Sequence, residues 1–141
     1  MAALLRDPYP IHWDAEGNEK MGIKGNVVNQ GPLNLSYLVN MLMNWQGQDC
    51  IRRLTVRFTG WVLDGDSLSA HGKVISLNNT NDELLAVCEI WLERDGERLL
   101  DRRLVAARAA LQLLHRFGGE RDRVGDAVVV EGEQPERRLA A

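Results

Sequence analysis

Residues 33–45 restrict the possible folds of this chain more than any other segment. If this segment is helical, apolar side chains occupy nearly all of its sides: Leu33, Leu35, Leu38, Val39, Met41, Leu42, Met43 and Trp45. A helix that is apolar all round is buried. Pro32 suits the first turn, because an N–H there would have no partner within the helix, and Gly47 suits the end. The sequence therefore predicts a buried helix over residues 31–46, against which the rest of the chain must pack.

The segments after this helix predict antiparallel strands. Residues 50–63 form the first, and apolar and polar side chains alternate most clearly over 54–58, as in a half-buried strand. Asp64, Gly65 and Asp66 indicate a hairpin-type turn. Further strands are expected over residues 68–77, 84–93 and 99–111, the last with a helical alternative over 106–114. One buried helix followed by an antiparallel meander is an α+β arrangement, and a curved sheet wrapped around a central buried helix is the hot-dog fold.

A chain of 141 residues, 45% of them apolar, has the size of one domain with a core of its own. We expect this domain over residues 1–117. Residues 118–141 are polar, with glycine, proline and mixed charges, and are expected to form a flexible tail. Within this tail, residues 127–130 could add a short strand or cover a neighbouring subunit.

Charge, hydropathy and cysteine content argue against several classes of function. The net charge of −3 gives no electrostatic case for binding nucleic acid. No apolar run approaches the roughly 18 residues needed to span a membrane, and the N-terminus lacks the pattern of a signal peptide. Cys50 and Cys88 fit neither a zinc site nor a disulfide framework, which indicates a reducing compartment and no bound metal. We therefore expect a cytoplasmic protein.

An acid and a histidine stand close together near the N-terminus, as Asp7 and His12, with two prolines between them. Proline fixes φ near about −65° and excludes a regular helix, so the loop is stiff and can hold both groups at a set distance. A His–Asp pair in a pocket can take a proton from water and return it. On spacing alone, a rigid turn with an ordinary surface Asp and His is equally compatible. Asp14 is expected to cap or orient the loop.

Three segments in order resemble the MaoC-like (R)-specific enoyl-CoA hydratase and dehydratase family. Arg-Asp-Pro-Tyr-Pro-Ile-His-Trp-Asp over residues 6–14 is similar to the family pattern Gly-Asp-x-Asn-Pro-Ile/Leu-His-x-Asp. Val-Asn-Gln-Gly-Pro over residues 28–32 stands where the family has Ala-His-Gly before its central helix. Residues 56–68 resemble the pattern Val-Arg-Phe-x-x-Pro-Val-x-x-Gly-Asp-x-Leu. The resemblance covers residues 2 to about 111 and implies the hot-dog fold.

The resemblance also implies a reaction and its site. In the family, the aspartate and histidine activate a water that adds to C3 of a trans-2-enoyl thioester and return the proton at C2, which assigns these roles to Asp7 and His12. A backbone N–H at the start of the central helix polarises the thioester carbonyl, which assigns that role to Gly31, with Asn29 and Gln30 beside it as substrate-binding residues. A helix N-terminus offers free N–H groups and partial positive charge to an enolate oxygen. The implied substrate is a coenzyme A thioester of fatty acid or steroid metabolism, with no cofactor.

The chain departs from the family pattern at several positions. Arg6 replaces a glycine, Tyr9 replaces an asparagine, and Gln30 replaces the second histidine. Val-Asn in place of Ala-His resembles a hydratase branch that acts on steroid side-chain thioesters and is often built from unlike subunits. Only six residues precede Asp7, where the family has a strand and most of a helix. We therefore expect an exposed sheet edge or one covered by another chain, in a homodimer or heterodimer.

Two other functions stay open at this point. Acyl-CoA thioester hydrolysis occurs on the same fold, but such enzymes usually place a carboxylate on or near the central helix, and residues 31–47 contain no Asp or Glu. A non-catalytic hot-dog subunit that supports an active partner is favoured by the missing N-terminal strand. The intact pair of Asp7 and His12 disfavours it.

Overall fold

The structure, a computed structural model, describes residues 6–23, 27–79, 83–108 and 132–133. A 3-10 turn, η1 (Pro10–His12), and a short helix, α2 (Ala15–Lys20), precede the long helix α3 (Gly31–Gln46). The strands that follow are β1 (Ile51–Leu54), β2 (Arg57–Phe58), β3 (Ser69–Asn79), β4 (Leu84–Arg94), β5 (Glu97–Arg108) and β6 (Gly132–Glu133). The possible strand over residues 127–130 lies outside the described residues.

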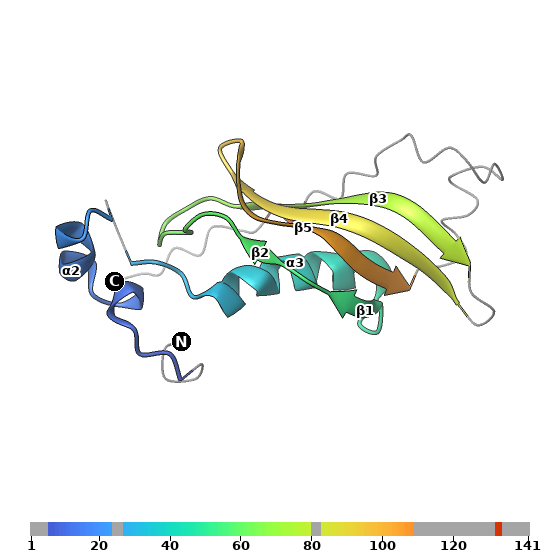
Figure 1. Cartoon of the computed structure of the whole chain (residues 1–141), viewed down its shortest axis with the longest axis horizontal. Coiled ribbons are helices and arrows are strands. Elements are labelled where there is room, and N and C mark those ends of the chain that lie inside the picture. The colour runs from blue at the N-terminus through green and yellow to red at the C-terminus, as the bar shows by residue number, and fades with distance from the viewer. Residues whose placement is uncertain (1–5, 24–26, 80–82, 109–131, 134–141) are drawn as a thin grey trace.

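The strands form one antiparallel sheet with the order β1-β5-β4-β3-β6, and β2 also pairs with β5. Long, curved β3, β4 and β5 make up most of it, and α3 lies along one face (Figure 1). This is the predicted α+β arrangement of a curved sheet around a central helix. Within the segment expected as a tail, Gly132 and Glu133 pair with Ala70 and Ser69 of β3.

The meander was predicted correctly for β3, β4 and β5. A turn does form at Asp64–Asp66, but the prediction that it is of the hairpin type was wrong. The strands on either side of this turn are not neighbours, because β2 pairs with β5 and β3 pairs with β4 and β6. The chain between β2 and β3 instead crosses from one side of the β4–β5 pair to the other. On the way, Val62 accepts a hydrogen bond from the backbone N–H of Asn29, just before α3 begins.

The first predicted strand is interrupted. From the pair Leu54↔Val105 to the pair Arg57↔Asp101, the chain advances three residues between β1 and β2 but four residues along β5. An offset of one residue exchanges the two faces of a strand. Alternation over residues 54–58 would turn Phe58 to the same face as Leu54, yet half of the Phe58 surface is exposed.

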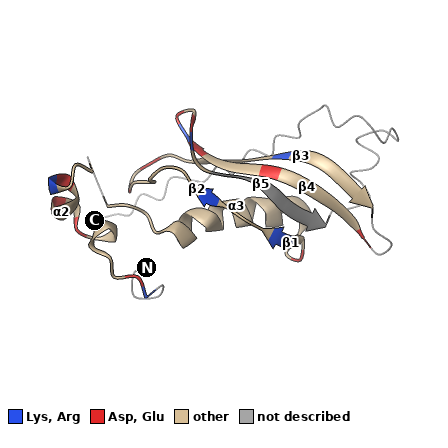
Figure 2. Ribbon diagram, in the orientation of Figure 1, with Lys and Arg blue, Asp and Glu red and all other residues tan. Residues whose placement is uncertain are grey.

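Helix α3 has the predicted bounds, and Gly47 ends it with a positive φ of 91° and an N–H that donates to Met43 O. Figure 2 shows no charged residue on this helix. The prediction that it is buried on all sides was wrong. Its buried residues are Asn34, Leu38, Met41 and Leu42, which lie on one face at helical spacing, because a single sheet can cover only one stripe of a helix.

The core lies between this face of α3 and the inner face of the sheet. Alternate residues of β4 are buried along most of its length, as expected for a strand with one covered face. They include Ala86, Cys88, Ile90 and Leu92, and the remaining core residues come mainly from α3, β3 and β5. Burial raises the pKa of the Cys88 thiol to about 12, so this side chain acts as a small apolar group.

The outer face of the sheet carries a stacked cluster around Trp91. The His71 ring stacks on it at 5.2 Å between centroids, and the Arg98 guanidinium lies 4.1 Å from its centroid. His71 Nε2 is also 2.8 Å from Ser69 Oγ. His71 is therefore a satisfied histidine on the sheet, with Ser69 and Trp91 as its partners. Among the described residues, no helix is both long enough and apolar enough to cross a membrane.

Candidate active site

The segment with Asp7 and His12 lies beyond the N-terminal end of α3, away from most of the sheet (Figure 1). Pro10 opens η1, the single turn that the prolines allow, and the His12 N–H donates to Tyr9 O at 3.1 Å. The structure brings the two predicted groups together, since His12 Nε2 is 3.3 Å from Asp7 Oδ2. The histidine side chain is 11% exposed and the carboxylate 45%. A nearly buried imidazole thus faces a carboxylate that solvent can reach.

The other ring nitrogen fixes the proton arrangement of His12. Nδ1 lies 2.7 Å from the backbone oxygen of Val28. A carbonyl oxygen can only accept, so Nδ1 must carry the proton of the neutral ring, and Nε2 keeps its lone pair. That lone pair points to the side where Asp7 lies. Nε2 can therefore take a proton from a group next to Asp7, and the imidazolium that results is stabilised by the carboxylate.

Buried amides hold the backbone of this loop. Ile11 O accepts hydrogen bonds from Val28 N at 2.8 Å and from Asn18 Nδ2 at 2.9 Å. Gln30 Nε2 donates to Asp7 O at 3.1 Å. Asn18 was not found by sequence reasoning, and its role becomes visible only in the structure, where it is the one buried residue of α2. Asn18 thus fixes the backbone next to His12, and Gln30 fixes the backbone of Asp7.

Asp14 caps α2, as predicted. Its Oδ1 accepts a hydrogen bond from Gly17 N at 2.9 Å. A Cβ at position 17 would meet the Asp14 carboxylate, so another residue there would displace the capping side chain. The Asp14 carboxylate therefore fixes the chain that follows His12.

The start of α3 supplies the third predicted element. Within the described part of the chain, the Gly31 N–H donates to no acceptor, and Pro32 has no N–H to offer. A Cβ at position 31 would lie 3.1 Å from the Phe58 ring, a tight contact that the ring could relieve only by shifting. The Asn29 N–H donates to Val62 O at 2.7 Å, so its backbone serves the fold. Because the Gln30 side chain contacts Asp7 O, the start of α3 lies next to the loop that carries the acid–histidine pair.

The buried polar residues of the described chain all lie in this region. They are Asn18, Gln30 and Asn34, each less than 5% exposed. The side-chain oxygens of Gln30 and Asn34 accept no hydrogen bond from the described residues. A buried acceptor without a donor costs roughly 1–3 kcal/mol, and buried polarity in the described chain is confined to α2 and the start of α3.

The described chain has a small cavity apart from this region and no cluster of metal ligands. A small apolar cavity lined by Met41, Trp45, Gly72 and Ile90, among others, lies under the C-terminal half of α3. It is about 15 Å along the helix from Gly31, at the usual rise per residue. No group of three His, Cys, Asp or Glu side chains in residues 6–23, 27–79 and 83–108 is arranged to bind a metal ion.

A curved antiparallel sheet packed on one central helix defines a hot-dog protein. The chain belongs to the MaoC-like family, since the family described as MaoC like domain matches residues 2–87, more than half of its length. This family includes hydratases and dehydratases.

A similar solved structure is that of a monoamine oxidase regulatory protein from Archaeoglobus fulgius, with 25% identity and a TM-score of 0.61. The match covers 77% of this chain and 78% of that one. No curated protein matches the sequence significantly.

Proposed function

We propose that this protein adds water to trans-2-enoyl-CoA to give 3-hydroxyacyl-CoA, or catalyses the reverse dehydration. One observation carries the proposal: His12 has its Nδ1 proton fixed by Val28 O and its Nε2 lone pair 3.3 Å from Asp7 Oδ2. This arrangement suits a base that takes a proton and later returns it. Both directions exchange only water and protons, so the reaction needs no cofactor.

In the proposed hydration, His12 Nε2 takes a proton from water while the water oxygen bonds to C3 of the substrate. The electron pair of the C2–C3 double bond moves toward the thioester, and the carbonyl oxygen becomes an enolate oxygen. The Gly31 N–H donates to that oxygen, and such a donor is typically worth about 3 kcal/mol in acyl chemistry. The imidazolium, stabilised by the Asp7 carboxylate, then gives its proton to C2 and restores the starting state.

Asn29 and Gln30 have different parts in this proposal. The amide nitrogen of Gln30 is already used by Asp7 O, so Gln30 acts mainly by holding the loop in place. Asn29 is half-buried and stands two residues before Gly31 in the chain. We assign Asn29 to contact with the thioester part of the substrate.

A second candidate is a hot-dog subunit that supports an active partner. The solved structure of similar fold is named as a regulatory protein, and the Asp7 carboxylate is open to solvent on one side. Thioester hydrolysis has less support, because α3 carries no carboxylate (Figure 2). Hydration remains the better proposal because a supporting subunit does not require the geometry of His12.

The direct test is conversion of crotonyl-CoA by the pure protein, followed as loss of the absorbance of the conjugated enoyl thioester. We expect turnover by the protein alone or after addition of a related hot-dog chain. The 3-hydroxy product should be identified by chromatography, which separates hydration from thioester cleavage. Failure to hydrate under both conditions, with acyl-CoA still bound, would favour the supporting subunit.

We further propose that two hot-dog chains, alike or unlike, associate through the region around the site. Five large apolar side chains there are at least half exposed: Tyr9, Trp13, Met21, Phe58 and Trp61. Exposed apolar surface of this kind commonly marks an interface. For the protein alone, we expect light scattering at micromolar concentration to give twice the mass of one chain. A monomeric mass would contradict self-association.

A further inference from the structure

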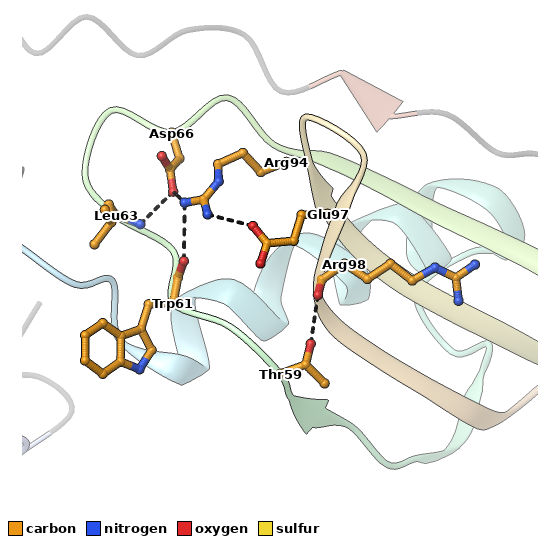
Figure 3. Close-up of polar contacts among 7 residues, drawn as sticks. All are labelled: Thr59, Trp61, Leu63, Asp66, Arg94, Glu97 and Arg98. Carbon is orange, nitrogen blue, oxygen red and sulfur yellow. Dashed lines mark hydrogen bonds and ion pairs between the residues drawn. The ribbon is translucent and has the colours of Figure 1, made fainter. Parts of the chain in front are cut away.

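The turn between β2 and β3 is tied to the end of β4 by an ion pair. Asp66 Oδ2 accepts the Leu63 N–H at 2.8 Å and an Arg94 Nη1 hydrogen at 2.5 Å (Figure 3). The Asp66 N–H in turn donates to Leu63 O at 3.1 Å, which closes the turn on itself. The side chains of Asp66 and Arg94 are 16% and 24% exposed. The pair is therefore shielded from solvent far more than an ordinary surface ion pair.

Arg94 has two further contacts that fix its position. Nη1 lies 3.4 Å from Trp61 O, and Nη2 lies 3.1 Å from Glu97 Oε2 (Figure 3). Arg94 is the last residue of β4, a strand that packs alternate residues into the core. The guanidinium thus connects the chain around residues 61–66 to a central strand of the core.

The tied turn holds the segment that leads into α3. Leu63 faces Val28 in an isolated antiparallel bridge. Two backbone hydrogen bonds flank it, from Asn29 N to Val62 O at 2.7 Å and from Asp64 N to Val27 O at 2.9 Å. Successive residues of an extended chain offer their backbone groups to opposite sides. The N–H and carbonyl of Val28 therefore point away from Leu63.

On that opposite side lies the candidate catalytic loop. Val28 N donates to Ile11 O at 2.8 Å, and Val28 O accepts from His12 Nδ1 at 2.7 Å. The segment 27–29 is thus bound between the turn on one side and His12 on the other. A displacement of the turn moves the carbonyl that fixes the proton and the orientation of the His12 ring.

We propose that Asp66 and Arg94 are positioning residues for the pair of His12 and Asp7. Through the turn and residues 27–29, they set the place of the Val28 carbonyl, and through that carbonyl the tautomer and direction of the imidazole. Neither residue has to touch the substrate. The consequence for catalysis rests on the proposed hydratase function, whereas the consequence for the histidine ring is a property of the protein alone.

The first test therefore observes the ring and not the reaction. In ¹⁵N NMR of the full chain above neutral pH, we expect the protein to show His12 protonated at Nδ1 and not at Nε2, with His12→Gln identifying the signals. In Asp66→Ala and Arg94→Met, we expect a mixture of both tautomers and exchange of the Nδ1 proton that is at least about tenfold faster, because its acceptor is displaced. Glu97→Gln is the matched control: it removes the more exposed partner of Arg94 and should leave the His12 signals unchanged.

The second test uses the hydration assay. Misplacement of a catalytic group by about 1 Å can cost a hundredfold, so we expect kcat to fall tenfold to a hundredfold, roughly, in both variants while KM changes little. Arg94→Lys keeps the charge beside Asp66 without the second nitrogen, and should recover part of kcat. If Asp66→Ala does not fold, Asp66→Asn and Arg94→Lys give the same comparison.

The outcomes separate this inference from the proposed function. Folded variants that keep the Nδ1 tautomer and the slow proton exchange of the unchanged protein would overturn the positioning role. Equal changes in Glu97→Gln would overturn it as well, because they would reflect general loosening. A protein that does not hydrate crotonyl-CoA, yet loses the fixed tautomer in Asp66→Ala and Arg94→Met, would refute the hydratase proposal and support the positioning role.

Discussion

Asp7→Asn and His12→Ala should each lower enoyl-CoA hydration on the order of a hundredfold or more. His12→Ala removes the nitrogen that takes the proton from water. Asp7→Asn keeps the shape of the side chain but removes the charge that stabilises the imidazolium at 3.3 Å. The measurement is the initial rate of crotonyl-CoA hydration at saturating substrate, with thioester binding measured separately by calorimetry. Binding should survive in both variants, because neither residue is expected to hold the coenzyme A part.

The double variant and matched controls make this result specific. If the two residues act as one unit, combining the changes should cost little beyond either alone. Glu16→Gln removes a carboxylate in α2 whose contact is a surface ion pair with Lys20, and His71→Gln removes a histidine on the outer face of the sheet. Both controls should keep full activity. An active protein whose Asp7→Asn and His12→Ala variants retain their turnover would place the reaction elsewhere.

Leu38→Ala should destabilise the protein by about 2–5 kcal/mol. Leu38 is fully buried on the face of α3 that packs against the sheet, so its loss leaves a cavity in the centre of the core. The free energy of unfolding should be measured by urea denaturation followed by circular dichroism, at one fixed protein concentration because of the expected association.

Asn40→Ala is the matched control for this change, since Asn40 lies on the exposed side of the same helix. Its effect should stay within about 0.5 kcal/mol, as is usual for surface positions. A Leu38→Ala variant as stable as Asn40→Ala would contradict the packing of α3 on the sheet.

Local chemistry made much of this protein predictable from its sequence. Pro32 and Gly47 set the two ends of α3 because one lacks an N–H and the other tolerates a positive φ. The strand expected over residues 84–93 matches β4 within one residue, and every second side chain along most of it meets the core. The prolines between Asp7 and His12 confine the loop to one short turn, which keeps the two groups within reach of each other.

The tertiary structure alone decided which segments meet. The pairing of β2 with β5, and the offset of one residue that exposes Phe58, depend on a strand some forty positions further along the chain. The acceptor for His12 Nδ1 lies 16 residues away, and Asp66 and Arg94 are 28 residues apart. Neighbouring residues restrict backbone angles and the period of burial, whereas these hydrogen bonds exist only because packing of the core brings distant chain segments to the same end of α3.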